Sequence, residues 1–183
     1  YLKLLWYFRS KFSFKTLNLF NSFGSTGLVI PSLNNFMKAE VDEIFNKKVN
    51  LIKTKDDLEN LDIYGIIFGD LIYDYYLNYY KDSEIEIFSE KFKVHLKYCI
   101  EQIVFWKNFI KDNNVKAINV SHTVYTNAIP VRIAIEQEIS SFQTTAKDIY
   151  RLSKERKFAY TDFKDFHKNF AMLNDSIKKN GII

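Results

Sequence analysis

The stretch that decides the fold is residues 115–145, VKAINVSHTVYTNAIPVRIAIEQEISSFQTT. It begins with a short β-branched run at residues 115–120, which is typical of a buried strand. An apolar helical pattern follows over residues 125–138, with Pro130 in the first turns, where proline is tolerated. A second strand is expected over residues 140–145. Two strands joined through a helix form a βαβ crossover, so this stretch predicts a parallel sheet.

The segments upstream continue this alternation of strands and helices. Residues 63–68, IYGIIF, form an apolar run that ends at Gly69 and Asp70, which predicts a buried strand. A helix is expected over residues 71–81. A longer helix is expected over residues 87–112, because its apolar positions recur at steps of three and four residues and fall on one stripe. The predicted fold class is α/β, with a Rossmann-like parallel sheet flanked by helices.

Shorter elements complete the expected domain. Residues 27–30 are an apolar run compatible with another strand, and an asparagine pair precedes a helix that extends to about Lys48. Thr54 is followed by acidic residues, which favours a capped helical turn. The asparagine pair at 113–114 can end the long helix, because asparagine tolerates the left-handed conformation. A final helix is expected between about residues 163 and 179.

Length and composition exclude several classes of protein. With 183 residues, 47% hydrophobic and 26% charged, the chain is neither disordered nor fibrous. Its one cysteine, Cys99, excludes a disulfide framework and falls on the stripe of the long helix, which predicts a packed, inert thiol. His95 and His167 have no partner pattern and are expected at the surface. The usual phosphate-loop, dinucleotide and nucleophile-elbow motifs are missing from the sequence, and no metal site or cofactor is predicted.

The net charge of +4 conceals an uneven distribution of charge along the chain. Residues 1–39 carry +5, residues 40–90 carry −8 and residues 91–183 carry +7. Most basic residues fall on amphipathic helical patterns, which is typical of solvated helix faces. We therefore expect no nucleic-acid partner.

Residues 1–23 form a separate cationic and aromatic segment, expected to be an amphipathic helical segment ahead of a Rossmann-like domain over residues 24–183. Such a segment either lies at a membrane interface or packs on its own protein, and internal packing is favoured because its apolar positions drift around the helix. The longest uncharged stretch, residues 16–37, is too polar to cross a bilayer, and no signal peptide is visible. A cytoplasmic location is expected, with peripheral contact at the inner face of the membrane as the alternative.

Functional residues are expected where the predicted strands end, because ligands of parallel sheets bind at that edge. Asp70 and Asp74 follow the first apolar run, and Ser121 and His122 follow the second. Asp70 is either a helix N-cap or a ligand or catalytic residue. His122 is either a surface residue or an imidazole that holds or deprotonates a sugar hydroxyl. Asp70 and His122 are expected to share one edge of one parallel sheet.

Two segments resemble those of a known family. Residues 63–77, IYGIIFGDLIYDYYL, and residues 115–135, VKAINVSHTVYTNAIPVRIAI, are similar to the N-terminal half of bacterial capsular and surface polysaccharide biosynthesis proteins, thought to be glycosyltransferases of the two-Rossmann-domain (GT-B) kind. The resemblance spans about residues 15–155. It implies that residues of both motifs face an acceptor cleft: Gly69, Asp70, Tyr73, Asp74, Ser121, His122 and Tyr125.

The resemblance implies the acceptor-side domain of a glycosyltransferase in capsule or surface polysaccharide biosynthesis. Asp70 or His122 would be the base, and the leaving diphosphate would meet either Arg132 or a basic cluster, with a solvated loop as the alternative for that cluster: Arg151, Lys154, Arg156 and Lys157. Nucleotide sugar and saccharide acceptor would meet through a second domain that this sequence does not show, so the chain alone is expected to be inactive. The alternative function is a non-catalytic binding or membrane-recruitment module of a polysaccharide assembly system.

Overall fold

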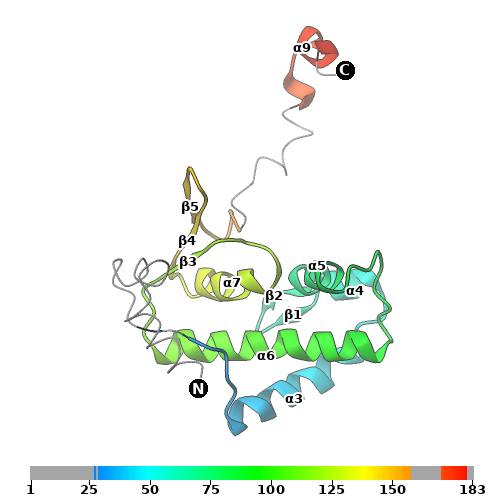
Figure 1. The fold of residues 1–183 in the computed structure, drawn as a ribbon, viewed down its shortest axis with the longest axis vertical. Coiled ribbons are helices and arrows are strands. Elements are labelled where there is room, and N and C mark those ends of the chain that lie inside the picture. Colours follow the sequence, from blue (N-terminus) through cyan, green and yellow to red (C-terminus); the bar gives the residue numbers. More distant parts are fainter. Residues whose placement is uncertain (1–26, 28, 158–169, 181–183) are drawn as a thin grey trace, which may run out of the picture. The chain divides into compact units, whose positions relative to one another are not determined.

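The structure, a computed structural model, describes residues 27, 29–157 and 170–180. In the unit that begins at Asn35, helix α6 (Glu90–Asp112) is the central element (Figure 1). Its predicted apolar stripe is confirmed by side chains that are fully buried at three- and four-residue steps: Phe92, Leu96, Cys99, Ile100 and Ile103. Cys99 is therefore a packed thiol, as predicted, and burial raises its pKa.

Capping residues set both ends of α6. The Ser89 hydroxyl accepts a hydrogen bond from the backbone N–H of Phe92 at 3.1 Å, so the helix begins at Glu90. Asn113 caps the other end, and Asn114 has a φ of 48°, the left-handed conformation expected of this asparagine pair.

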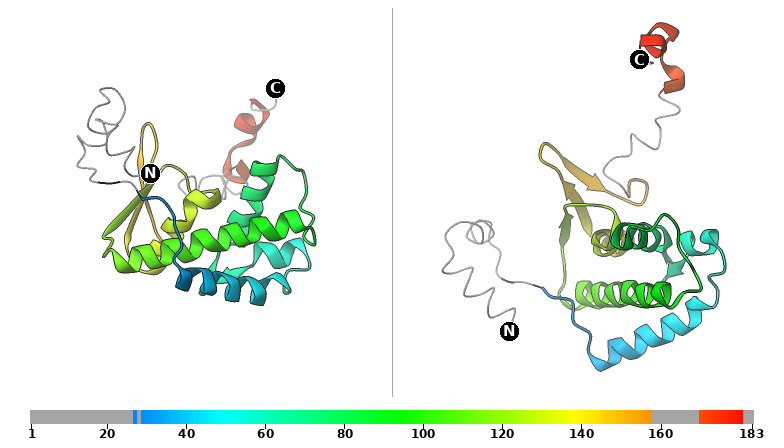
Figure 2. Two further views of the ribbon diagram at one scale, coloured as in Figure 1. Left: turned by 60° about the horizontal axis from the view of Figure 1, so that its bottom comes forward. Right: turned by 45° about the vertical axis from the view of Figure 1, so that its right-hand side comes forward.

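Three further helices pack around α6. Helix α3 (Asn35–Val49), which was predicted, lies along one side of it. Helices α5 (Gly69–Tyr80) and α7 (Ile129–Glu136) lie on the opposite side, and two further views show the same arrangement (Figure 2). The core is therefore mainly helical, with α6 between two layers.

The short helix α4 (Lys55–Glu59) begins with a capping box. The Thr54 hydroxyl accepts a hydrogen bond from the Asp57 N–H at 3.1 Å, and the Asp57 carboxylate accepts one from the Thr54 N–H at 2.9 Å. The N–H groups of the N-cap residue and of Asp57 are thereby satisfied, which confirms the predicted capped turn.

Residues 63–68 do not form the predicted buried strand. They contribute to an antiparallel hairpin of β1 (Asp62–Ile63) and β2 (Ile66–Ile67), joined by a turn at Tyr64 and Gly65. The turn residues have φ values of 59° and 78°, the left-handed pair that a tight two-residue hairpin turn needs. Gly65 supplies this conformation without strain and folds the apolar run back on itself.

Helix α5 starts immediately after the hairpin and closely against α4. The Gly69 N–H donates to the Leu61 carbonyl at 3.2 Å, and a Cβ at Gly69 would lie 1.7 Å from the carbonyl oxygen of Leu58. Only a residue without a side chain fits this contact. Packing against α4 thus accounts for a glycine at this position, and the substrate-facing role that the resemblance implies for Gly69 stays a prediction.

A mixed sheet of order β3-β4-β5 flanks α7. Strands β3 (Ala117–Val120) and β4 (Ser140–Thr144) are parallel and are joined through the 3-10 helix η1 (Tyr125–Ala128) and α7, so the predicted βαβ crossover is confirmed. Strand β5 (Ile149–Leu152), which was not predicted, pairs antiparallel with β4. The α/β class is confirmed in this form, with a mixed rather than wholly parallel sheet.

Two expectations about the sheet are wrong. Residues 29–30 are not in a strand. The hairpin that precedes Asp70 is a sheet of its own, so Asp70 and His122 do not share one edge of one parallel sheet. The physical reason is the positive-φ turn at residues 64–65, which uses the backbone groups of residues 62–67 within the hairpin.

The predictions for the two ends of the chain are only partly covered. Residues 1–23, His167 and the first part of the expected final helix lie outside the described residues. Helix α9 (Asp175–Asn180) lies within the range predicted for that final helix. None of the described helices combines the length and the apolar character that crossing a membrane requires.

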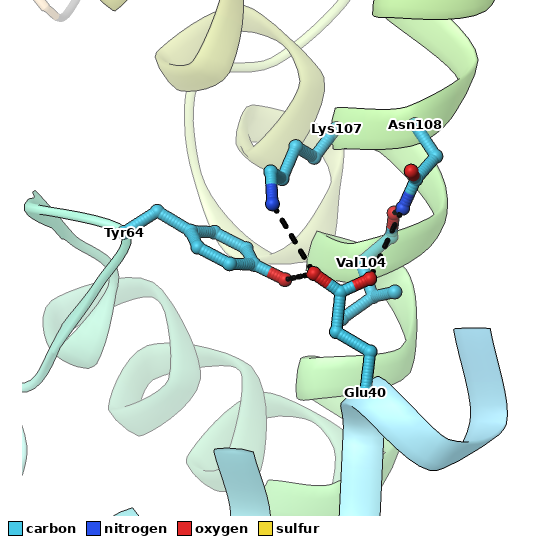
Figure 3. Close-up of polar contacts among 5 residues, drawn as sticks. All are labelled: Glu40, Tyr64, Val104, Lys107 and Asn108. Atoms are coloured by element: carbon cyan, nitrogen blue, oxygen red, sulfur yellow. Dashed lines mark hydrogen bonds and ion pairs between the residues drawn. The ribbon is translucent and has the colours of Figure 1, made fainter. Parts of the chain in front are cut away.

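A polar cluster ties α3, the hairpin turn and α6 together (Figure 3). The Glu40 carboxylate accepts hydrogen bonds from the Tyr64 hydroxyl at 2.6 Å and from the Lys107 ammonium at 3.2 Å. Its second oxygen lies 3.4 Å from the Asn108 amide nitrogen. Partial burial by itself raises the pKa of Glu40, but these hydrogen bonds and the Lys107 charge together outweigh it and lower that pKa.

Replacing Gly69 by alanine tests the close approach of α5 to α4. We expect G69A to lower the free energy of unfolding by about 2–3 kcal/mol, because the methyl group overlaps the Leu58 carbonyl. Urea denaturation measures this loss. The control is G27A, at a position with no atom within 4 Å of the added Cβ, which should leave the unfolding midpoint unchanged. Equal midpoints for the two variants would contradict the packing role of Gly69.

Replacing Glu40 by glutamine tests the polar cluster through its pH dependence. The folded state lowers the pKa of Glu40, so its stabilisation is full above the ordinary value of 4.5 and is lost as the pH falls through the lower folded-state pKa. E40Q should cost about 1 kcal/mol at pH 7, and this difference should shrink toward pH 3. The control E43Q removes an exposed pair with Lys47 on the same helix and should cost much less. A cost for E40Q that is constant with pH would be inconsistent with this account.

Candidate functional site

An ion pair between α5 and α7 joins two of the predicted site residues. The Arg132 guanidinium donates to both oxygens of Asp70, at 2.5 Å to Oδ1, and its Nη1 also donates to the carbonyl of Ile67 at 2.8 Å. The Arg132 side chain is only 5% exposed and that of Asp70 is 39% exposed. The pair therefore fixes the start of α5 against α7.

Asp70 is not the N-cap of α5, which was one of its two predicted roles. The N-cap is Phe68, and Asp70 lies in the first helical turn, where the helix dipole favours a negative charge. Because both of its oxygens accept hydrogen bonds from Arg132, Asp70 serves in this structure as the counterion of a buried cation. A catalytic role for Asp70 stays a prediction.

Asp74 lies one turn further along α5 and faces solvent. The pKa of its carboxyl is raised, first by desolvation and then by the negative charges of Asp70 and Glu59, while Arg132 and Lys55 oppose the rise. A carboxylate with a raised pKa is a stronger proton acceptor than an ordinary aspartate.

Tyr73 lines a hollow beside this acidic turn. The hollow has a volume of about 340 Å³ and is enclosed by α4, α5 and the loop before α6: Lys55, Leu58, Tyr73, Glu84, Ile85 and Ile87. The Lys55 ammonium lies 4.6 Å from the centre of the Tyr73 ring, and the neighbouring Tyr73 hydroxyl and Glu59 carboxylate raise the pKa of Lys55. The charged residues that line this hollow are therefore one cation, Lys55, and one acid, Glu84.

The residues that follow β3 lie near α5 because η1 packs on that helix. Ser121 and His122 are exposed at the carboxyl end of β3, where the Ser121 carbonyl accepts a hydrogen bond from the Gln143 amide at 3.2 Å. Tyr125 opens η1, which packs on α5, and its ring centre lies 6.5 Å from that of Tyr75. Tyr125 and Arg132 therefore contact the helix that carries Asp70. In the described part of the chain, His122 forms no hydrogen bond or ion pair with Asp70.

The basic cluster at residues 151–157 is mixed with acidic side chains. The Lys154 ammonium pairs with Glu136 at 3.0 Å, and the Arg156 guanidinium lies 5.1 Å from the Tyr150 ring centre. A hollow of about 350 Å³ at this place is lined by acids and bases together, among them Glu138, Arg151, Lys154 and Glu155. This mixture favours the solvated-loop interpretation over a diphosphate site.

A third hollow, between α5 and α6, was not predicted from the sequence. It has a volume of about 310 Å³ and is lined by four tyrosines, one valine and one histidine: Tyr75, Tyr79, Tyr80, Val94, His95 and Tyr98. We name it the tyrosine hollow. The signal that would have found it is the spacing of the tyrosines of α5, which recur at four-residue steps and fall on one helix side.

His95 is buried, so its predicted surface position is wrong. Its side chain is 3% exposed, and its Nε2 lies 3.2 Å from the carbonyl oxygen of Ile72, which holds the ring on α5. Burial lowers the pKa of His95 despite this hydrogen bond. The imidazole is therefore neutral at pH 7 and forms an uncharged wall of the hollow.

Comparisons with models of known protein families, with curated proteins and with solved structures find no match.

Replacing Asp70 by asparagine tests the ion pair with Arg132. D70N leaves a buried guanidinium without its anion, and because Asp70 is partly exposed we expect a cost of about 1–3 kcal/mol in the free energy of unfolding. Asp56 provides a matched control, since it occupies the same first-turn position of α4 with no ion pair among the described residues. Chemical denaturation should show a much smaller cost for D56N.

A double-mutant cycle with Arg132→Met completes this test. In the R132M background the cost of D70N should fall to that of D56N, because no buried charge remains to be compensated. A D70N cost that is the same in both backgrounds would show that the pair contributes nothing.

Proposed function

We propose that this chain is the acceptor-side domain of a glycosyltransferase that assembles bacterial capsular or surface polysaccharide. The resemblance of residues 63–77 and 115–135 to that family supports the proposal. The parallel β3-α7-β4 crossover also supports it, because this is the building unit of a Rossmann-like domain. The two resembling segments contact each other through α5 and η1.

The Asp74 carboxyl is the observation that carries the proposal. It is solvent-facing, its pKa is raised, and the adjacent residue Tyr73 lines a hollow. These are the properties of a general base for a sugar hydroxyl, whose proton must be accepted by a group of raised basicity. We assign this role to Asp74 and a positioning role to Asp70, with the exposed His122 as the second candidate base.

The proposed reaction is an inverting transfer. Asp74 accepts the proton of the acceptor hydroxyl as the hydroxyl oxygen forms a bond to the anomeric carbon of a nucleotide sugar. The bond from that carbon to the diphosphate oxygen breaks, and the diphosphate leaves with the electron pair. The donor would be bound by a second domain, so the chain alone should bind acceptor without turnover.

Transfer assays with the complete reading frame test this function. Saccharide transfer should be measured from a panel of nucleotide sugars with the 183-residue chain alone and with the chain joined to whatever its reading frame encodes beyond it. We expect turnover only in the second case. Turnover by the chain alone would contradict the domain assignment, and saccharide binding without any turnover in either case would favour the recruitment-module alternative.

The D74N variant tests the assigned base. In the complete reading frame it should lower kcat by about 100-fold or more, because the proton acceptor is lost. The wild-type rate should fall as the pH drops through a pKa above 3.8, since the carboxyl must be ionised to act, and D74N should lack this dependence. The control D112N changes an exposed acid at the end of α6 and should retain the full rate. A D74N rate equal to wild type would transfer the base role to His122.

A further inference from the structure

The tyrosine hollow contains the largest group of aromatic side chains around any described cavity. Its floor is formed by the buried His95 and the half-buried Tyr75, and its rim by Tyr79 and Tyr98. Its volume of about 310 Å³ is at the lower end of the range for small-ligand sites, the size suited to one or two rings. None of the residues assigned a catalytic role above lines it.

Charge excludes two classes of ligand from the hollow. Among the residues that the structure describes, no aspartate, glutamate, lysine or arginine lines it, and its histidine is neutral because burial lowers the pKa of that ring. The lining itself offers a diphosphate no cation and a cationic ligand no carboxylate, and the Lys91 ammonium beside Tyr80 is already paired with Asp82. The polar groups available are the phenol hydroxyls of four tyrosines, which both donate and accept hydrogen bonds.

The ring geometry also argues against a cage for a quaternary ammonium group. The centre of the Tyr75 ring lies 5.7 Å from that of Tyr79 and 6.1 Å from that of Tyr98, and the Tyr79 and Tyr80 ring centres are 4.8 Å apart. Rings this close contact one another and leave no room for a cation between them. The Lys91 ammonium already lies 4.3 Å from the Tyr80 ring centre. A ligand must therefore lie across the rings.

Two of the rings are exposed without contributing much to the core. Tyr79 is 62% exposed and Tyr98 is 41% exposed, yet both lie at the rim of the same hollow. The ring centre of their neighbour Tyr75 lies 6.5 Å from that of Tyr125 of η1, so one lining residue of the hollow contacts the second resembling segment. Exposed aromatic rings that border a cavity are typical of a binding surface.

We propose that the tyrosine hollow binds a neutral saccharide ring, whose apolar C–H face lies across the tyrosine rings while its hydroxyls pair with the phenols. A sugar ring is amphipathic in this way, and tyrosine matches it with an apolar ring and a polar tip. This site deepens the proposed function, on which its identification as an acceptor subsite rests. The binding itself is independent of any transfer reaction.

Binding should be measured on the complete 183-residue chain by calorimetry and by saturation-transfer NMR. The probes are neutral hexose and N-acetylhexosamine oligosaccharides, with uridine diphosphate and choline as charged comparisons. We expect binding of at least one neutral saccharide, and about tenfold weaker binding in Y79A and in Y98A. Near-ultraviolet circular dichroism checks that each variant is folded. The control F36A removes another exposed aromatic ring, on α3, and should leave the affinity unchanged.

Other outcomes overturn the proposal. If choline binds instead of saccharides, and its binding is lost in Y79A, the hollow is a cation site. If none of the neutral saccharides binds, the hollow is not a saccharide site. Saccharide binding that is unchanged in both Y79A and Y98A would place the sugar elsewhere, even if the complete reading frame transfers sugar. If saccharide binding depends on Tyr79 and Tyr98 but no assay detects sugar transfer, the saccharide site is supported and the glycosyltransferase function is rejected.

Discussion

The guanidinium of Arg132 joins two parts of the chain that lie more than sixty residues apart in sequence. Its hydrogen bonds reach the last residue of β2 and the first turn of α5, while its own helix α7 packs on the sheet and on α6. A buried cation without its anion is costly, so α5 can occupy only a position that brings Asp70 to Arg132. The placement of both candidate sites depends on this contact, because α5 contributes residues to each.

Helix α5 divides two chemical environments by its periodicity. Tyr73 and Asp74 lie on the side near α4, where charged side chains gather and the pKa of the Asp74 carboxyl is raised. Tyr75 and Tyr79 lie on the side near α6, where the hollow has no charged lining. One helix therefore carries the proposed proton acceptor Asp74 on one side and the uncharged aromatic lining of the tyrosine hollow on the other.

The sequence predicted the elements that local patterns specify. The stripe of α6, the capping box at Thr54 and the β3-α7-β4 crossover all depend on residues a few positions apart. The hairpin is not predicted, because residues 63–68 form a continuous apolar run that indicates a single strand. Gly65 within this run is the signal of the turn. The burial of His95 depends on a carbonyl 23 residues away, and the Asp70–Arg132 pair on residues 62 apart, and sequence spacing specifies neither contact.

Cys99 gives the protein an internal reporter. It is the chain's one sulfhydryl, fully buried, and its Sγ lies 3.6 Å from Nε2 of His95 at the floor of the tyrosine hollow. An alkylating reagent can reach this sulfur only when α6 and α5 separate locally, so the rate of mass gain reports how often they open. A molecule seated above His95 would hold that region closed and slow alkylation in proportion to its occupancy. The alkylation rate of the native Cys99 sulfur therefore reports the occupancy of the tyrosine hollow without any added label.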